Sequence, residues 1–220
     1  MELASVSYRT SGDWPERADG EGSSIELENL PSAAATEDEV RAFLNHGRSW
    51  SASALYQGSP GRFDPFVRAV RFSEILAHTD LGADWIELLN TGTEAVDLLG
   101  CTLSDTMDFP TLWTFTTNWV LQPGEFRVLP TASLGFAFSE LGESAFLLQV
   151  VGTNVVRFLD SVDFPATARE ESLGLFRRSD AQLDFTELRA NTPGAANALP
   201  RIGPVVVSEI MFAPEPGKAE

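Results

Sequence analysis

The sequence predicts an all-β protein folded as an antiparallel sandwich, with one short helix near its N-terminus. Between residues 66 and 176, short runs rich in Val, Ile, Phe and Trp are separated by turn residues, which is the pattern of sandwich strands. No helical period competes with these runs. Prolines lie at the ends of the runs, where they leave the hydrogen-bond ladder intact. These observations favour packed β-sheets.

The expected strands cover residues 66–76, 85–90, 95–99, 101–104, 112–115, 119–121, 126–129, 144–151, 154–159, 161–164 and 173–176. Gln122-Pro123-Gly124-Glu125 is typical of a type II turn, because proline and glycine occupy its two central positions. Gly152-Thr153 turns a hairpin. In the strand 85–90, Ile86 and Leu88 share one face, and the face that carries Glu87 is predicted to be the more exposed one.

Three short segments recur along the chain. Val207-Ser208-Glu209-Ile210-Met211 echoes Phe72-Ser73-Glu74-Ile75-Leu76, and Gly58-Ser59-Pro60-Gly61 is echoed by Asn191-Thr192-Pro193-Gly194. Ser5-Val6-Ser7-Tyr8 is echoed by Ser161-Val162-Asp163-Phe164. The first two pairs have nearly the same separation, which indicates a tandem array. We therefore predict that residues 1–62 are the C-terminal part of one repeat, residues 66–198 a complete repeat, and residues 202–220 the first strand of a third.

The N-terminal part is predicted to hold two strands, at residues 3–8 and 23–28, and one helix. Thr36 is the expected N-cap, and Glu39 three residues later completes a capping box. Gly47 ends the helix. Because a partial repeat cannot bury its own apolar faces, the two end fragments are expected to pair with each other or with the complete repeat. The alternative is that both ends are poorly ordered.

The complete repeat resembles the lamin-tail domain of the bacterial type. The residues that carry the resemblance are Ser73-Glu74-Ile75, Asp84-Trp85-Ile86-Glu87-Leu88, Asn90, Gly92, Val96-Asp97-Leu98, Gly100, Leu103-Ser104-Asp105, Leu121, Pro123-Gly124, Asp160-Ser161-Val162 and Thr192-Pro193-Gly194. The stretch 106–111 departs from the pattern as a lengthened loop. The resemblance implies an immunoglobulin-like sandwich with Greek-key connections. It also implies a module that occurs in series in large exported or surface proteins.

Charge and composition narrow the class of partner. The chain has 15 Lys and Arg against 32 Asp and Glu, a net charge of −17, which disfavours nucleic-acid binding. No apolar run is long enough to span a bilayer, and no signal peptide is visible. The single cysteine, Cys101, excludes an internal disulfide and is interpreted as a small core residue. An extracellular or cell-surface location follows from the resemblance alone. The expected partners are a protein or cell-surface polymer, and neighbouring repeats through strand pairing.

The sequence gives only a weak signal for a metal site. Asp80 and Asp84 lie in one acidic loop and Asp105 and Asp108 in another, and calcium would accept such carboxylates together with backbone carbonyls. No twelve-residue calcium loop is present. His78 stands beside the first loop, but one histidine and two carboxylates fall short of a zinc site. No cofactor is expected, and calcium is the one metal left open.

Two tryptophans are candidate ligand contacts. Trp113 and Trp119 flank one turn, and exposed coplanar rings there would stack on sugars. Core packing is the commoner fate of tryptophan in a small sandwich. Catalytic patterns are missing: Gly142-Glu143-Ser144-Ala145-Phe146 lacks the second glycine of a nucleophile elbow, and Glu170-Glu171 is a carboxylate pair in sequence only.

The sequence thus predicts a protein that is not an enzyme. Its expected role is that of an interaction or spacer module of a larger bacterial surface or secreted protein. The alternative is a carbohydrate-binding accessory domain of a secreted enzyme, with Trp113 and Trp119 as its platform.

Overall fold

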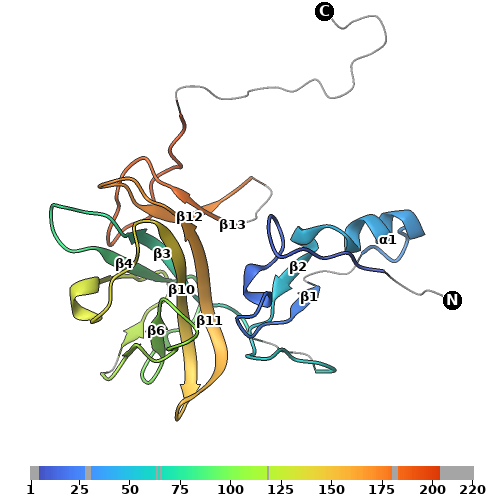
Figure 1. Cartoon of the computed structure of the whole chain (residues 1–220), viewed down its shortest axis with the longest axis horizontal. Coiled ribbons are helices and arrows are strands. Elements are labelled where there is room, and N and C mark those ends of the chain that lie inside the picture. The colour runs from blue at the N-terminus through green and yellow to red at the C-terminus, as the bar shows by residue number, and fades with distance from the viewer. Residues whose placement is uncertain are drawn as a thin grey trace, which may run out of the picture.

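A computed structural model describes residues 5–27, 31–62, 64, 66–117, 119–179 and 183–203. The protein is an antiparallel β-sandwich with a smaller N-terminal segment packed at its side (Figure 1). One α-helix, α1 (Glu37–Leu44), lies in that segment. The predicted all-β class, the sandwich and the single short helix are confirmed. No helix in the described ranges is long and apolar enough to cross a membrane.

The sandwich has two main sheets. The five-stranded sheet has the order β13 (Leu183–Glu187), β12 (Leu173–Arg177), β3 (Val70–Leu76), β4 (Trp85–Asn90) and β9 (Phe126–Pro130). The four-stranded sheet has the order β11 (Asn154–Pro165), β10 (Gly142–Val151), β6 (Thr102–Ser104) and β7 (Trp113–Thr114). A short pair, β5 (Val96–Asp97) and β8 (Val120–Leu121), lies at one end. Because β9 pairs with β4 and β12 pairs with β3, the chain crosses between the sheets as Greek-key connections do.

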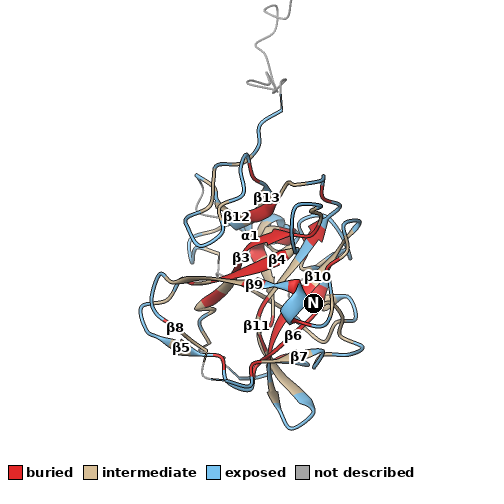
Figure 2. Cartoon of the chain, turned by 90° about the vertical axis from the view of Figure 1, so that its left-hand side faces the viewer, coloured by how far each residue is buried: buried red, intermediate tan, exposed pale blue. Residues whose placement is uncertain are grey.

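The main core lies between the two sheets, where buried residues concentrate (Figure 2). The five-stranded sheet contributes Phe72, Ile86 and Leu88, and the four-stranded sheet contributes Leu103 and Leu147, all at most 1% exposed. Burial of side chains of this size supplies most of the stabilisation, at about 1.5–3 kcal/mol each. A second cluster, Phe146, Leu148 and Phe158, lies outside this core on strands β10 and β11. The four-stranded sheet is therefore covered on both faces.

The N-terminal segment, residues 5–62, is built on a hairpin-like pair, β1 (Ile25–Leu27) and β2 (Trp50–Ala52), with α1 between them in sequence. Thr36 caps α1 and forms the predicted capping box with Glu39: the Thr36 hydroxyl accepts from the Glu39 N–H, and the Glu39 carboxylate accepts from the Thr36 N–H. Short 3₁₀ turns at Glu16–Ala18, Gly47–Ser49 and Thr131–Ser133 complete the chain's helical elements in the described ranges.

Residues 54–56 extend the four-stranded sheet beyond its edge strand β11. The Tyr56 N–H donates to the Val156 carbonyl at 3.1 Å, and the Phe158 N–H donates to the Ala54 carbonyl at 2.8 Å. An exposed sheet edge presents unpaired backbone groups, and pairing with another segment satisfies them. The N-terminal segment is thus joined to the sandwich by main-chain hydrogen bonds.

Arg17 also holds the N-terminal segment against the sandwich. Its guanidinium is 4.2 Å from the ring centroid of Phe158 and donates to the Ser53 carbonyl at 2.9 Å and to the Ser161 hydroxyl. Arg17 is only 4% exposed. Burial lowers its pKa to about 10, so it is charged at neutral pH. A charged, fully hydrogen-bonded arginine on an aromatic face is a strong anchor because its loss would leave several acceptors unpaired.

Several sequence predictions are wrong in detail. The face of β4 that carries Glu87 is not exposed, because Glu87 is 0% exposed. Residues 5–8 of the predicted strand 3–8 form no strand; the Ser7 N–H donates instead to the Asn45 side chain at 2.7 Å. Strand β13 was not predicted. The first sandwich strand begins at Val70 and not at Phe66. Residues 204–220, which include most of the predicted third-repeat strand, lie outside the described residues.

We predict that Arg17→Ala detaches the N-terminal segment while the sandwich stays folded. The change removes the contact with Phe158 and leaves buried acceptors unpaired, which costs about 2–4 kcal/mol. Limited trypsin digestion followed by mass spectrometry should show faster loss of residues 5–62 and an intact sandwich. The matched control is Arg9→Ala, an exposed arginine in the same segment. Equal digestion of both variants would contradict the assigned role of Arg17.

Candidate functional site

The most unusual polar feature of the sandwich is a pair of buried glutamates. Glu74 on β3 and Glu87 on β4 lie directly opposite each other in the strand register. Both are 0% exposed. The register of β3 shifts between Phe72 and Glu74, which places this bulge beside the pair. Like charges directly opposite each other on neighbouring strands are destabilising, so the pair needs a specific set of partners.

The turn at residues 192–194 supplies those partners. Glu74 accepts hydrogen bonds from the Thr192 N–H at 3.0 Å, from the Thr192 hydroxyl at 2.7 Å and from the Ser172 hydroxyl. Glu87 accepts from the Gly194 N–H through Oε2 at 2.5 Å. The turn therefore closes over the two carboxyl groups and satisfies three of their four oxygens, since Glu87 Oε1 is buried without a hydrogen-bond partner.

Asn197 holds the same turn to the sheet. Its side-chain amide donates to the Ser73 carbonyl at 2.8 Å and to the Leu175 carbonyl at 2.9 Å, and its oxygen accepts from the Ser73 hydroxyl at 3.2 Å. Gly174 lies against Asn197, because a Cβ there would be 2.9 Å from Asn197 Nδ2 and 2.6 Å from Leu188 Cδ1, so a side chain would force both to move. Residues 191–197 are thus packed on β3, β4 and β12 and held there by hydrogen bonds.

Burial raises the pKa of Glu87, and the nearby charge of Glu74 raises it further. The Gly194 N–H opposes this shift by stabilising the carboxylate. No cation pairs with either glutamate among the side chains that the structure describes. Burial of two opposed negative charges is therefore disfavoured, which agrees with the direction in which the pKa of Glu87 is shifted.

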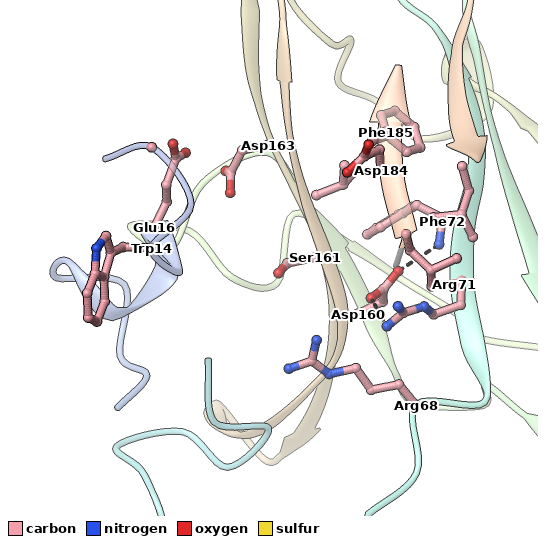
Figure 3. A pocket seen from close by; sticks show the side chains of 14 residues that line it. Trp14, Glu16, Arg68, Arg71, Phe72, Asp160, Ser161, Asp163, Asp184 and Phe185 are labelled. Carbon is pink, nitrogen blue, oxygen red and sulfur yellow. Dashed lines mark hydrogen bonds and ion pairs between the residues drawn. The ribbon is translucent and has the colours of Figure 1, made fainter. Parts of the chain in front are cut away.

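A groove of about 350 Å³ lies between the N-terminal segment and the sandwich (Figure 3). Arg68, Arg71, Asp160, Asp163 and Asp184 give it a mixed charge. Asp160 is fixed across the two sheets: it accepts from the Phe72 N–H at 2.8 Å and pairs with Arg71 at 3.2 Å. Burial raises the pKa of Asp160, and Arg71 opposes that shift.

The charged groups of Asp160 and Arg68 in the groove hold segments of the fold together. Asp160 ties β11 to the backbone of β3, and the Arg68 guanidinium donates to the Ala52 carbonyl at 2.6 Å, which ties the chain before β3 to β2. Burial raises the pKa of Glu16 at the rim, and the charge of Asp163 adds to the shift. Neither histidine nor cysteine occurs among the described residues that line the groove. Its arrangement is that of a polar junction between two packed parts.

Two of the candidate metal ligands have other partners in the structure. Asp80 pairs with Arg169 at 2.7 Å, and the Asp84 carboxylate accepts from the Thr79 N–H at 3.0 Å. Asp105 and Asp108 lie in the separate loop between β6 and β7. In the described part of the chain, no group of three or more His, Cys, Asp or Glu side chains could hold a metal ion.

Trp113 and Trp119 do meet, but not as a platform. Their ring centroids are 6.4 Å apart and the ring planes are 85° apart. Both rings also lie against Phe115, which is fully buried, and both are partly buried against the main core. Arg127 lies over Trp119 at 5.0 Å. Perpendicular, half-buried rings cannot both stack on the face of one sugar, so the predicted coplanar surface does not form.

The buried glutamates were not singled out as a site from the sequence. In the sequence, Glu74 and Thr192-Pro193-Gly194 belong to the echoed segments and to the family resemblance, and Glu87 belongs to the resemblance and to a strand face predicted to be exposed. One signal was present: a carboxylate inside an apolar strand run, as in Ile86-Glu87-Leu88, requires compensation when both faces of the strand are covered. What supplies the compensation could not be inferred, because Thr192 is over a hundred residues away along the chain.

Comparison of the chain with models of protein families, with curated proteins and with solved structures found no match.

We predict that Glu87→Gln stabilises the protein at pH 8 and changes little at pH 4. Because the folded-state pKa of Glu87 is raised, its contribution is complete below the ordinary glutamate pKa and is lost as the pH rises through the folded-state value. Removing the charge should therefore increase the unfolding free energy at pH 8 by about 1–3 kcal/mol. Urea unfolding at pH 4 and pH 8 measures the unfolding free energy of both proteins. Glu94→Gln, at an exposed position, is the control; equal effects of the two substitutions would refute the assignment.

Cys101 should be almost unreactive in the folded protein. It is buried, and burial together with the charge of Asp97 raises its pKa to about 11. Its thiolate fraction at pH 8 is then about a hundredfold below that of an ordinary thiol. Alkylation by iodoacetamide should be slow in buffer and fast in denaturant, with Thr153→Cys on the exposed β10–β11 turn as the reactive control. Rapid modification of Cys101 in buffer would show that this part of the core opens readily.

Proposed function

We propose that this protein is a non-catalytic interaction or spacer module of the lamin-tail type, belonging to a larger bacterial surface or secreted protein. The observation that carries the proposal is the junction between the N-terminal segment and the sandwich. There, residues 54–56 add to the edge of β11, and Arg17 lies on Phe158. A sandwich whose edge is joined to a second packed unit through its own backbone is suited to serial assembly.

The residues behind the family resemblance support the lamin-tail assignment. Several of them have a direct structural purpose: Glu74 and Glu87 bind the turn at Thr192 and Gly194, and Asp160 binds the Phe72 N–H. The Asn90 side chain donates to the Leu121 carbonyl at 2.9 Å and thereby ties β4 to β8. A pattern that is explained by closure of the sandwich favours a structural module, because these side chains are buried against other segments.

The spacer role requires a rigid junction, which a distance measurement between two spin labels tests. Labels at Arg41→Cys on α1 and Thr153→Cys on the β10–β11 turn are both at exposed positions. We expect one narrow distance distribution in the wild-type background and a broad one when Arg17→Ala is added. A broad distribution without Arg17→Ala would contradict a rigid spacer.

Titration with polysaccharides, followed by tryptophan fluorescence, separates this proposal from the carbohydrate-binding alternative. Because Trp113 and Trp119 are perpendicular and packed on the core, we expect no saturable change. A saturable change that Trp113→Phe removes, while Trp14→Phe leaves it in place, would favour carbohydrate binding instead.

A further inference from the structure

The sandwich itself shows how one repeat holds its first strand. Strand β3 runs antiparallel to β12, with Ile75 opposite Leu173 and Glu74 opposite Gly174. The Glu74 carboxylate then receives the hydroxyl groups of Ser172 and Thr192. A strand of the pattern Ser-Glu-Ile is thus recognised twice, by backbone pairing along its edge and by hydroxyl groups at its glutamate.

The N-terminal segment repeats the receiving half of this arrangement. Ser24-Ile25-Glu26-Leu27 has the pattern of Ser172-Leu173-Gly174-Leu175, and both stretches begin the first strand of an antiparallel pair. In the sandwich, the Ser172 N–H donates to Asn191, which precedes Thr192. In the N-terminal segment, Ser24 lies against Gly58, because a Cβ at Gly58 would be 2.6 Å from the Ser24 hydroxyl.

In the part of the chain that the structure describes, sheet β1–β2 has two strands, and no strand beside β1 corresponds to β3. The Ser53 N–H donates to the Ser24 carbonyl, so the backbone groups of Ile25 and Leu27 alternate to the opposite edge. No backbone hydrogen bond to those groups occurs within the described ranges. Within the described residues, β12 therefore has β3 as an outer partner strand, whereas β1 has no such partner.

We infer that the outer edge of β1 and the Ser59-Pro60-Gly61 turn receive residues 205–211 of a second copy of this chain. That stretch contains Ser208-Glu209-Ile210, the pattern of Ser73-Glu74-Ile75, and it follows the last described residue, Gly203. The template fixes the register: Ile210 lies opposite Ile25, and Glu209 lies opposite Glu26 and accepts from Ser24 and Ser59. Repetition of this contact is head-to-tail and joins copies in series.

Glu26 occupies the place that Glu209 would take. Its carboxylate accepts the Ser59 hydroxyl at 2.6 Å, whereas the corresponding position in the sandwich is Gly174, which has no side chain. Pairing therefore requires Glu26 to release Ser59, and the two glutamates then lie on neighbouring strands. Glu26 therefore weakens the pairing, and removal of its carboxylate should strengthen the pairing. An unspecific apolar contact would not respond to this change.

Disulfide trapping between two full-length chains tests the inference. One chain carries Ile25→Cys and the other Ile210→Cys, and the mixture is oxidised with copper–phenanthroline; Cys101 is buried and does not compete. We expect a cross-linked dimer with this pair. Replacing Ile210→Cys by Met211→Cys moves the thiol to the opposite face of the strand and should abolish the cross-link. Equal yields from both mixtures, or none from either, would overturn the proposed register.

Three further variants test the recognition chemistry in the same assay. Glu26→Ala should speed cross-linking about two- to fivefold, because like charges across strands are removed. Ser59→Ala should slow it about tenfold by removing a hydrogen bond to a charged group, whereas the exposed control Ser11→Ala should not. A single chain with both Ile25→Cys and Ile210→Cys that closes on itself as a monomer at all concentrations would refute the second-copy assignment.

This inference rests on the module function proposed above, but the experiments can disprove either proposal without the other. Absence of the cross-link would leave the rigid junction and the lack of polysaccharide binding unchanged. A flexible junction or saturable polysaccharide binding would remove the module assignment whatever the cross-linking shows.

Discussion

The hydrogen bonds that Thr192 and Gly194 give to two buried glutamates are the constraint around which the sandwich closes. Glu74 and Glu87 lie opposite each other on central strands, and both lose their water on folding. Without the turn, burial of the pair would cost several kcal/mol. The turn therefore has to arrive from the far end of the domain, and its position determines where β12 and β13 can lie. The two glutamates couple the first strands of the sandwich to the last.

The same dependence on distant partners recurs at the edge of the molecule. Asp160 on β11 binds the backbone of β3 and so fixes the distance between the sheets. Arg17 and residues 54–56 then cover the outer side of β11. In each case a polar or charged group is buried and fully committed to another segment. Such contacts favour one arrangement of the parts because alternatives leave them unpaired.

The polar groups support the proposal of a non-catalytic module. The carboxyl groups of Glu87 and Asp160, whose pKa values are raised by burial, accept hydrogen bonds from backbone N–H groups of other segments. The groove beside Asp160 is a junction between segments, and the tryptophan pair belongs to the core. Strand β1 is at the edge of its sheet, and this is the edge at which we propose that a further strand binds.

Local patterns in the sequence determined the β class, most strand positions and the capped helix at Thr36, because alternation, turn residues and capping depend on neighbours in the chain. They also include the echo of Ser73-Glu74-Ile75 at Ser208-Glu209-Ile210, on which the proposed pairing with β1 rests. Tertiary structure alone decided that Glu87 is buried, that Trp113 and Trp119 are perpendicular, and that Arg17 joins the two parts. Those outcomes depend on which distant segment of the chain packs on a given face. The alternation of residues along one strand carries no information about which segment that is.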